Sequence, residues 1–167
     1  HAISELTGRR YEPRSEEGAR MRRIADHVRA VCFMISDGVH PSNEGRGYVE
    51  RKVLRRSVRD GMALGMKAPF LHKLVPTVAD VMKAAYPELT EWRDNIGQVV
   101  KGEEEKTFDA YDRGMPLLEK RIDELAKAGE KIFPAEDMFL LHDSLGFTVE
   151  QAEPSLAEKG LKLDRVG

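Results

Sequence analysis

Two adjacent segments between residues 41 and 59 hold the side chains best suited to binding nucleic acid. The first is a turn, residues 41–47, which carries an amide side chain at Asn43. The second is a basic run whose cations are Arg51, Lys52, Arg55, Arg56 and Arg59. On a helix, at about 100° per residue, these cations fall within an arc of roughly 140°. Guanidinium groups bind phosphate oxygens through paired N–H groups, so such a row can follow a phosphate backbone.

The turn adds groups that could read a base. Asn43 offers both a donor and an acceptor, which is the pair needed at a base edge. Gly45 and Gly47 allow another backbone to approach closely, and Arg46 adds a cation beside them. The alternative interpretation is an ordinary loop followed by a solvated helix face, because many surface helices carry Lys and Arg.

Length and composition fit one compact domain. The chain has 167 residues, of which 41% are hydrophobic, enough for a real core. The net charge of -2 argues against a general polyanion binder, but residues 1–60 hold 13 basic and 9 acidic residues, a balance of +4. The motifs therefore lie in the basic half, as expected if one face binds nucleic acid.

The sequence also indicates where the protein acts. No apolar run approaches the roughly 18 residues that span a membrane, and no signal-peptide pattern opens the chain. We therefore expect a soluble, cytoplasmic protein with no membrane partner. The first residue is His1 rather than Met, so we expect a piece of a longer protein.

The apolar pattern predicts an all-α fold. Ser15 is suited to cap a helix that continues to about Ser36, with Asp37 and Gly38 ending it. Its residues at core spacing are Met21, Ile24, Val28, Val31, Cys32 and Ile35. A second helix over residues 47–60 sets the cations against an apolar side formed by Val49, Val53, Leu54 and Val58.

Further helices should follow these two. An apolar face over residues 70–82 is interrupted at Pro76, and residues 86–128 form a long charged stretch that should bend or break at 114–116. The apolar thread of this stretch is Ile96, Val99, Val100, Phe108, Leu117, Leu118, Ile122 and Leu125. The glutamates of the run 103–105 are predicted to be solvated.

A short C-terminal part completes the predicted fold. A helix from Pro134 carries Met138, Phe139 and Leu141 up to a turn at residues 143–146, a last helix covers about 148–159, and a tail or edge strand covers 161–167. The result is an irregular helical bundle with a long, kinked helical arm and a short C-terminal helical subdomain. Within a single domain, residues 1–167, its regions are an N-terminal arm (1–14), a basic half (15–85), a helical arm (86–133) and a C-terminal subdomain (134–167).

Few residues have the spacing of a catalytic or metal site. No Gly-rich phosphate loop is present, and His27, His40, His72 and His142 form no metal set with Cys32. Cys32 is the sole cysteine, so no internal disulfide is possible, and its apolar neighbours predict a buried core thiol. His142 and Asp143 are adjacent and point about 100° apart on a helix, which suits a catalytic pair poorly. A simpler role for Asp143 is to cap the turn that follows it.

Several segments together resemble one known family. They are residues 24–29, 35–49, 69–71, 86–89, 103–108 and 141–147. In this order, and over nearly the whole chain, they are similar to the region that follows the catalytic core in alanyl-tRNA synthetases. The string Pro-Ser-Asn-Glu-Gly-Arg-Gly at residues 41–47 is the most specific of these matches.

The resemblance implies a helical tRNA-recognition domain of a larger class II alanine-tRNA ligase, which attaches alanine to tRNA using ATP. The implied partners are the acceptor stem of tRNA(Ala) and the catalytic domain of the same parent chain. ATP with magnesium, and zinc, are implied only for other domains of the parent. This chain lacks the ATP and alanine site, so we expect no cofactor here and no activity of the chain alone.

The family motifs also assign roles to individual residues. They match Asn43 and Asp143 to the residues that read a G·U wobble pair, whose free guanine amino group projects into the shallow minor groove. Asp143 can only accept and so fits that amino group, whereas Asn43 could donate to the uracil or accept from the guanine. The cations expected to hold the tRNA backbone are Arg46, Arg51, Lys52, Arg55, Arg56 and Arg59.

The chain departs from the family pattern near both Asn43 and Asp143. His142, Ser144, Leu145 and Thr148 replace two aromatic residues, a threonine and a proline around Asp143. Glu50 stands where an apolar residue is usual, and Lys52 replaces an arginine. An alternative function is a helical protein-interaction module whose basic face docks an acidic partner without RNA specificity.

Overall fold

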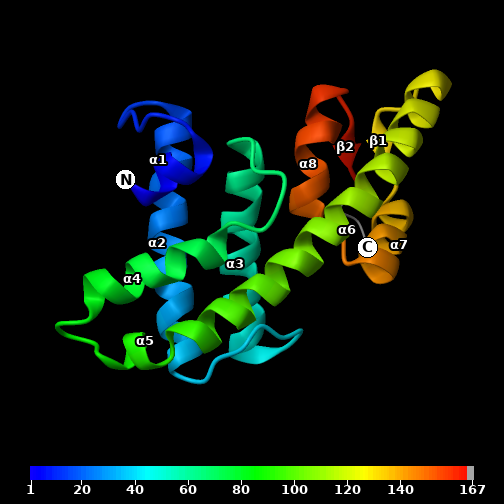
Figure 1. Cartoon of the computed structure of the whole chain (residues 1–167). Helices are drawn as coiled ribbons and strands as arrows, with labels where there is room; N and C mark the ends of the chain where they lie inside the picture. Colours follow the sequence, from blue (N-terminus) through cyan, green and yellow to red (C-terminus); the bar gives the residue numbers. More distant parts are fainter. Residues whose placement is uncertain (165–167) are drawn as a thin grey trace. The chain divides into compact units, whose positions relative to one another are not determined.

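The fold is all-α, as predicted. The computed structural model describes residues 1–164, and of Glu150 only the backbone. Within that range the chain forms eight α-helices, one 3-10 helix and two strands of two residues each (Figure 1). It divides into two compact units, residues 1–106 and 107–167, and the division falls within the long helix α6 (Arg93–Ala128). No helix of the described part is long and apolar enough to span a membrane.

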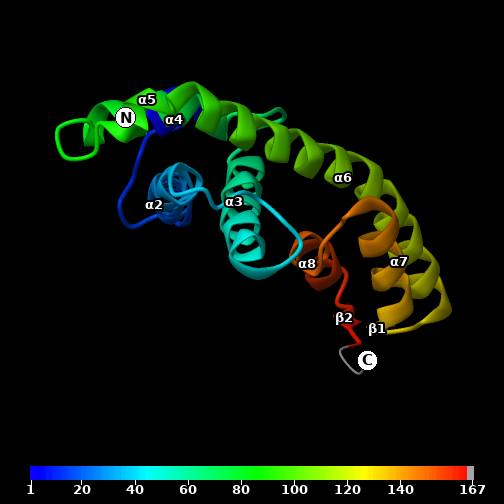
Figure 2. The same ribbon diagram turned by 90° about the horizontal axis from the view of Figure 1, so that it is seen from below.

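The first unit is built around two long helices that lie side by side. Its elements are α1 (Ala2–Thr7), α2 (Glu16–Ser36), α3 (Gly45–Ala63), the 3-10 helix η1 (Leu71–Leu74), α4 (Val75–Met82), α5 (Glu88–Glu91) and the start of α6. Helices α4 and α5 pack against α2, which also contacts α3; α2 is seen nearly end-on in Figure 2. The ring of Phe33 in α2 meets Tyr86 before α5 edge to face, with centroids 4.8 Å apart.

Helix α2 begins and packs as the sequence predicts. The Ser15 hydroxyl accepts a hydrogen bond from the backbone N–H of Gly18 at 2.9 Å, which satisfies one free donor of the first turn. All residues predicted at core spacing are buried, including Cys32. Asp37 ends the helix, and Gly38 follows with a φ of 80°, in the left-handed region that favours glycine.

Some apolar residues of the first unit are exposed, contrary to prediction. Val49 is 56% exposed because α3 buries a different stripe, which includes Gly47, Leu54 and Val58. Val81 is 74% exposed because the short helix α4 buries Val75 and Ala79 on the opposite side. Pro76 lies in the first turn of α4, where its missing N–H breaks no helical bond.

The second unit has its own apolar core. Its elements are the remainder of α6, β1 (Ile132–Phe133), α7 (Ala135–Leu145), α8 (Val149–Glu158) and β2 (Lys162–Leu163). The strands pair in parallel, with Ile132 opposite Lys162 and Phe133 opposite Leu163, so the predicted edge strand exists; residues 165–167 lie outside the described part. The core is formed by Leu118, Ile122, Leu125, Phe133, Met138, Leu141, Phe147, Ala152, Leu156 and Leu161.

The predicted interruption at residues 114–116 does not occur, because α6 continues through them. Pro116 is exposed, so water can satisfy the carbonyl that loses its helical partner. A Cβ on Gly114 would lie 2.2 Å from the Phe147 ring, so this glycine allows the ring to pack directly on the helix. Leu117 and Phe139, predicted in apolar faces, are 51% and 64% exposed.

A glycine substitution tests this packing in the first unit. A Cβ on Gly61 would lie 2.1 Å from the buried ring of Phe70, so Gly61→Ala should lower the free energy of unfolding by about 1 to 3 kcal/mol. A Cβ on Gly102 in α6 would have no heavy atom within 4 Å outside the local helix backbone, so Gly102→Ala should be neutral or stabilise by up to about 1 kcal/mol. Urea unfolding of both variants checks the difference, and equal stabilities would contradict the packing described here.

Candidate nucleic-acid interface

The turn that presents Asn43 is closed by its own hydrogen bonds. The backbone N–H of Ser42 donates to the Gly47 carbonyl at 3.1 Å, and the Ser42 hydroxyl donates to the Glu44 carbonyl at 2.8 Å. Gly45 has a φ of 58°, and a Cβ on Gly47 would lie 2.2 Å from the carbonyl oxygen of His40. Both glycines are therefore required by the turn itself, which leaves Asn43 exposed at its tip.

The Asn43 side chain is connected to α6 through α3. Arg51 Nη1 donates to Asn43 Oδ1. Arg51 Nε lies 3.0 Å from Glu103 Oε1, an ion pair in which the N–H is not aimed well enough at the oxygen for a hydrogen bond. Arg55 Nε donates to the same Oε1 at 3.0 Å. The Glu103 side chain is only 2% exposed, so two arginines of α3 share one buried carboxylate.

The prediction that residues 103–105 form a solvated run is wrong for Glu103 and Glu104. Glu104 is fully buried, and its carboxylate accepts from the backbone N–H groups of Phe70, Leu71 and His72 at 2.8, 2.7 and 2.9 Å. It thereby satisfies the free donors at the start of η1. Glu105 is exposed and lies 3.7 Å from the Lys101 ammonium.

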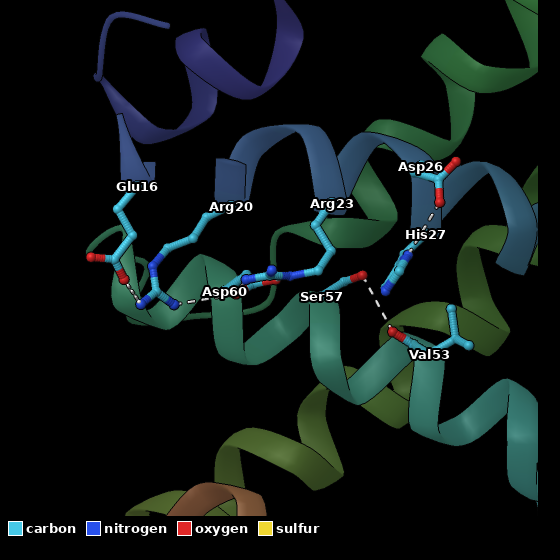
Figure 3. A network of polar contacts seen from close by, with 8 residues as sticks. All are labelled: Glu16, Arg20, Arg23, Asp26, His27, Val53, Ser57 and Asp60. Carbon is cyan, nitrogen blue, oxygen red and sulfur yellow. Dashed lines mark hydrogen bonds and ion pairs between the residues drawn. The ribbon is translucent and has the colours of Figure 1, made fainter. Parts of the chain in front are cut away.

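A third buried carboxylate, that of Asp60, joins α2 to α3 (Figure 3). Asp60 is fully buried and accepts from Arg23 Nε and Nη2 at 2.5 and 2.6 Å and from Arg20 Nη1 at 3.2 Å. The hydrogen bonds to Asp60 raise the pKa of Arg23. Arg20 also donates to Glu16, at 2.5 Å. The sequence-based reasoning did not identify this cluster.

The predicted cationic face therefore divides in two. Arg51 and Arg55 turn toward the Glu103 carboxylate and are mostly buried, with side chains 19% and 24% exposed. The outward part consists of the exposed residues Arg46, Lys52 and Arg56 and the half-buried Arg59. The Lys52 ammonium lies 4.9 Å from the ring centroid of the exposed Tyr48. This outward part is the surface on which a phosphate backbone could lie.

Glu50 is a buried carboxyl of a different kind. It is fully buried, and neither of its oxygens has a hydrogen-bond partner among the described residues. Burial raises its pKa from 4.5 to about 8, with a further rise from Glu103 and an opposing effect of Arg51. The carboxyl is therefore mostly neutral at pH 7.

Asp143 lies in the second unit, in the last turn of α7 rather than in the turn that follows. It is exposed, and its carboxylate has no hydrogen bond among the described residues. The following turn is closed by the backbone, with Gly146 N–H donating to His142 O at 2.8 Å and Phe147 N–H to Leu141 O at 3.3 Å. The capping role and the catalytic pairing with His142 thus have no supporting contact in the described part of the chain.

Cys32 behaves as the predicted core thiol. Its side chain is buried in α2, and burial raises its pKa to about 12. A thiol with this pKa is not ionised at neutral pH, so it is a poor nucleophile.

Comparisons with known proteins identify relatives along the whole chain. A family model for class II (A) tRNA synthetases matches residues 1–167. The alanine–tRNA ligase of Pediococcus pentosaceus is 42% identical over 167 residues, which is 100% of this chain and 19% of the relative. Those of Polaromonas naphthalenivorans and Acetivibrio thermocellus are 45% and 44% identical, over 88% and 99% of this chain and 16% and 19% of the relatives. The chain thus spans about a fifth of the length of these relatives.

Substitutions in the glutamate run test the structural difference between its members. Glu103→Gln removes the charge that both α3 arginines share, so the free energy of unfolding should fall by about 2 kcal/mol or more. Glu105→Gln removes only an exposed pair and should change it by less than about 0.5 kcal/mol. Urea unfolding measures both variants, and similar effects for the two would support a uniformly solvated run.

The raised pKa of Glu50 predicts a pH-dependent stability. Between pH 4.5 and about 8 the folded state keeps a proton that the unfolded state has released. The free energy of unfolding should therefore fall as pH rises through this window. Glu50→Gln has no such titration, so its stability relative to the parent should rise between pH 5 and 8, by about 1 kcal/mol or more. Thermal unfolding across this range measures the difference, and parallel curves would show that Glu50 does not titrate in this way.

Proposed function

Since the chain belongs to the class II (A) family of tRNA synthetases, we propose that it is the acceptor-stem recognition domain of an alanine–tRNA ligase. The parent would be a cytoplasmic enzyme that attaches alanine to tRNA(Ala) with ATP, and its catalytic domain would be the neighbour of this domain. Because the chain covers about a fifth of its relatives, this activity is part of the proposal. The observation that carries it is Asn43, which is exposed on a closed turn, is connected through Arg51 to the buried carboxylate of Glu103, and is followed in the sequence by the exposed cations of α3.

The proposal assigns the reading of a G·U wobble pair to Asn43 and Asp143. Both side chains are exposed, one in each unit. The Asp143 carboxylate can only accept, which suits the free amino group of the wobble guanine in the shallow RNA minor groove. A Watson–Crick pair would engage or displace that amino group, so the two residues could distinguish the pairs.

The backbone of the stem would be held by the outward cations. Lys52, Arg56 and Arg59 share one side of α3 at helical spacing, and Arg46 is exposed in the first turn of the same helix. Contacts of this kind set the register of a protein on a duplex and supply affinity that is independent of sequence. Asn43 and Asp143 would then determine which base pair is preferred, and the outward cations would supply affinity that is independent of sequence.

Cofactors belong to other parts of the parent in this proposal. The described residues contain no group of three or more His, Cys, Asp or Glu side chains that could hold a metal ion. In the proposal, ATP with magnesium, and zinc, would be bound by other domains of the parent. Alanine-dependent pyrophosphate exchange by the chain alone would contradict this division.

The base-reading role can be tested with acceptor-stem RNA duplexes that differ in one pair, G·U or G·C. Asn43→Ala and Asp143→Ala should each reduce the preference for the G·U duplex by about 1 to 3 kcal/mol, the usual contribution of a good base contact. Asp143→Asn keeps the shape but adds donors, so it should lose most of the preference. Binding to the G·C duplex should change little.

Melting temperatures of the same variants are the control. If Asp143 were a structural cap, Asp143→Ala would lower the stability by about 0.5 to 2 kcal/mol and would weaken binding to both duplexes together. An unchanged G·U preference would rule out its readout role. A chain that binds neither duplex would favour the protein-interaction alternative.

A further inference from the structure

We infer that Arg51 is a positioning residue that orients the Asn43 amide, so that Asn43 reads the RNA as a hydrogen-bond donor. The inference rests on the proposed function for the role of Asn43 as a base reader. It replaces the sequence-based interpretation of Arg51 as a phosphate contact, and it resolves the choice between donor and acceptor that the sequence leaves open for Asn43.

The orientation of the amide follows from the chemistry of arginine. A guanidinium group has only N–H donors and no acceptor. The Asn43 atom that Arg51 Nη1 contacts must therefore be the carbonyl oxygen Oδ1, because the amide nitrogen would set two donors against each other. Asn43 Nδ2 has no hydrogen-bond partner among the described residues, and the side chain is exposed. The amide thus keeps two donors for a ligand.

Arg51 is itself held in place. Its Nε lies 3.0 Å from Glu103 Oε1, and its side chain is 19% exposed. Arg55 binds the same carboxylate, which is 2% exposed. To reach a phosphate, Arg51 would have to leave a buried carboxylate, and breaking such a pair is unfavourable. The exposed Arg56 on the same helix makes no ion pair with another described residue, so it is the natural comparison.

A donating Asn43 complements Asp143 chemically. The minor-groove edge of a pyrimidine offers the O2 acceptor, and the edge of guanine offers its amino group as a donor. Asn43 would then donate to the uracil O2, whereas Asp143 would accept from the guanine amino group. Arg51 would thereby determine which kind of atom Asn43 can recognise.

The binding experiment compares Arg51 with Arg56 on the G·U and G·C duplexes at several salt concentrations. Arg51→Ala should reduce the ratio of G·U to G·C affinity by about tenfold and leave the salt dependence unchanged. Arg51→Lys should also lower the ratio, since one ammonium cannot bridge Asn43 and Glu103 as a fork does. Arg56→Ala should keep the ratio and flatten the plot of log affinity against log salt by about one unit or less.

Two further variants test the donor role. Asn43→Asp keeps an acceptor for Arg51 but has no donor, so it should lose the G·U preference as fully as Asn43→Ala does. A preference retained in Asn43→Asp would show that Asn43 acts as an acceptor. In the Asn43→Ala background, Arg51→Ala should change the ratio no further; an equal effect with and without Asn43 would show that Arg51 acts independently.

A measurement without RNA separates this inference from the proposed function. In NMR spectra of the free chain, Arg51→Ala should shift and average the side-chain amide signals of Asn43, whereas Arg56→Ala should leave them in place. If the parent chain has no G·U preference, or if Asn43→Ala keeps it, the proposed function fails, and the amide signals still decide whether Arg51 orients Asn43. If Asn43→Ala loses the preference while Arg51→Ala keeps both the preference and the amide signals, the inference alone is overturned.

Discussion

The first unit depends on the requirement that a buried carboxylate have donors around it. An ionised carboxylate taken out of water is strongly unfavourable unless it is paired or hydrogen-bonded. Glu103 meets the requirement with two arginines of α3, Asp60 with two arginines of α2, and Glu104 with the backbone N–H groups at the start of η1. Each carboxylate therefore fixes the relative position of the two elements that it joins. Apolar contacts alone would determine this position less precisely.

This requirement also decides which cations remain for a ligand. On α3, the guanidinium groups of Arg51 and Arg55 are committed to Glu103, whereas Lys52 and Arg56 remain exposed. A simple count of basic residues on the helix would overstate the surface that can bind phosphate. In the proposed function, the committed arginines would still bear on recognition, because one of them donates to the amide of Asn43. Cations that pair with a buried carboxylate and cations that are exposed thus alternate along one helix.

The sequence predicts the local features of this arrangement but not its partners. The cap at Ser15 follows from its residue type and the core stripe of α2 from periodicity within one helix, and both predictions are confirmed. The periodicity of α6 also indicated burial of Glu103 and Glu104, because these residues continue the core spacing from Val100 to Thr107. Their charge favoured a solvated interpretation, because their donors lie more than 30 residues away in the sequence and cannot be found from local pattern. Asp60 was missed for the same reason.

Glu50 shows how closely the candidate site depends on this charge arrangement. Its buried carboxyl has no hydrogen-bond partner in the described part of the chain, and the neutral form is favoured beside the charged Glu103. With Glu50 neutral, Arg51 and Arg55 together exceed Glu103 by one positive charge, which favours a nearby polyanion. Ionisation of Glu50 would cancel that excess and would place a second carboxylate near Arg51. The neutral state of one buried acid therefore favours both the Arg51–Glu103 pair and the positive potential next to Asn43.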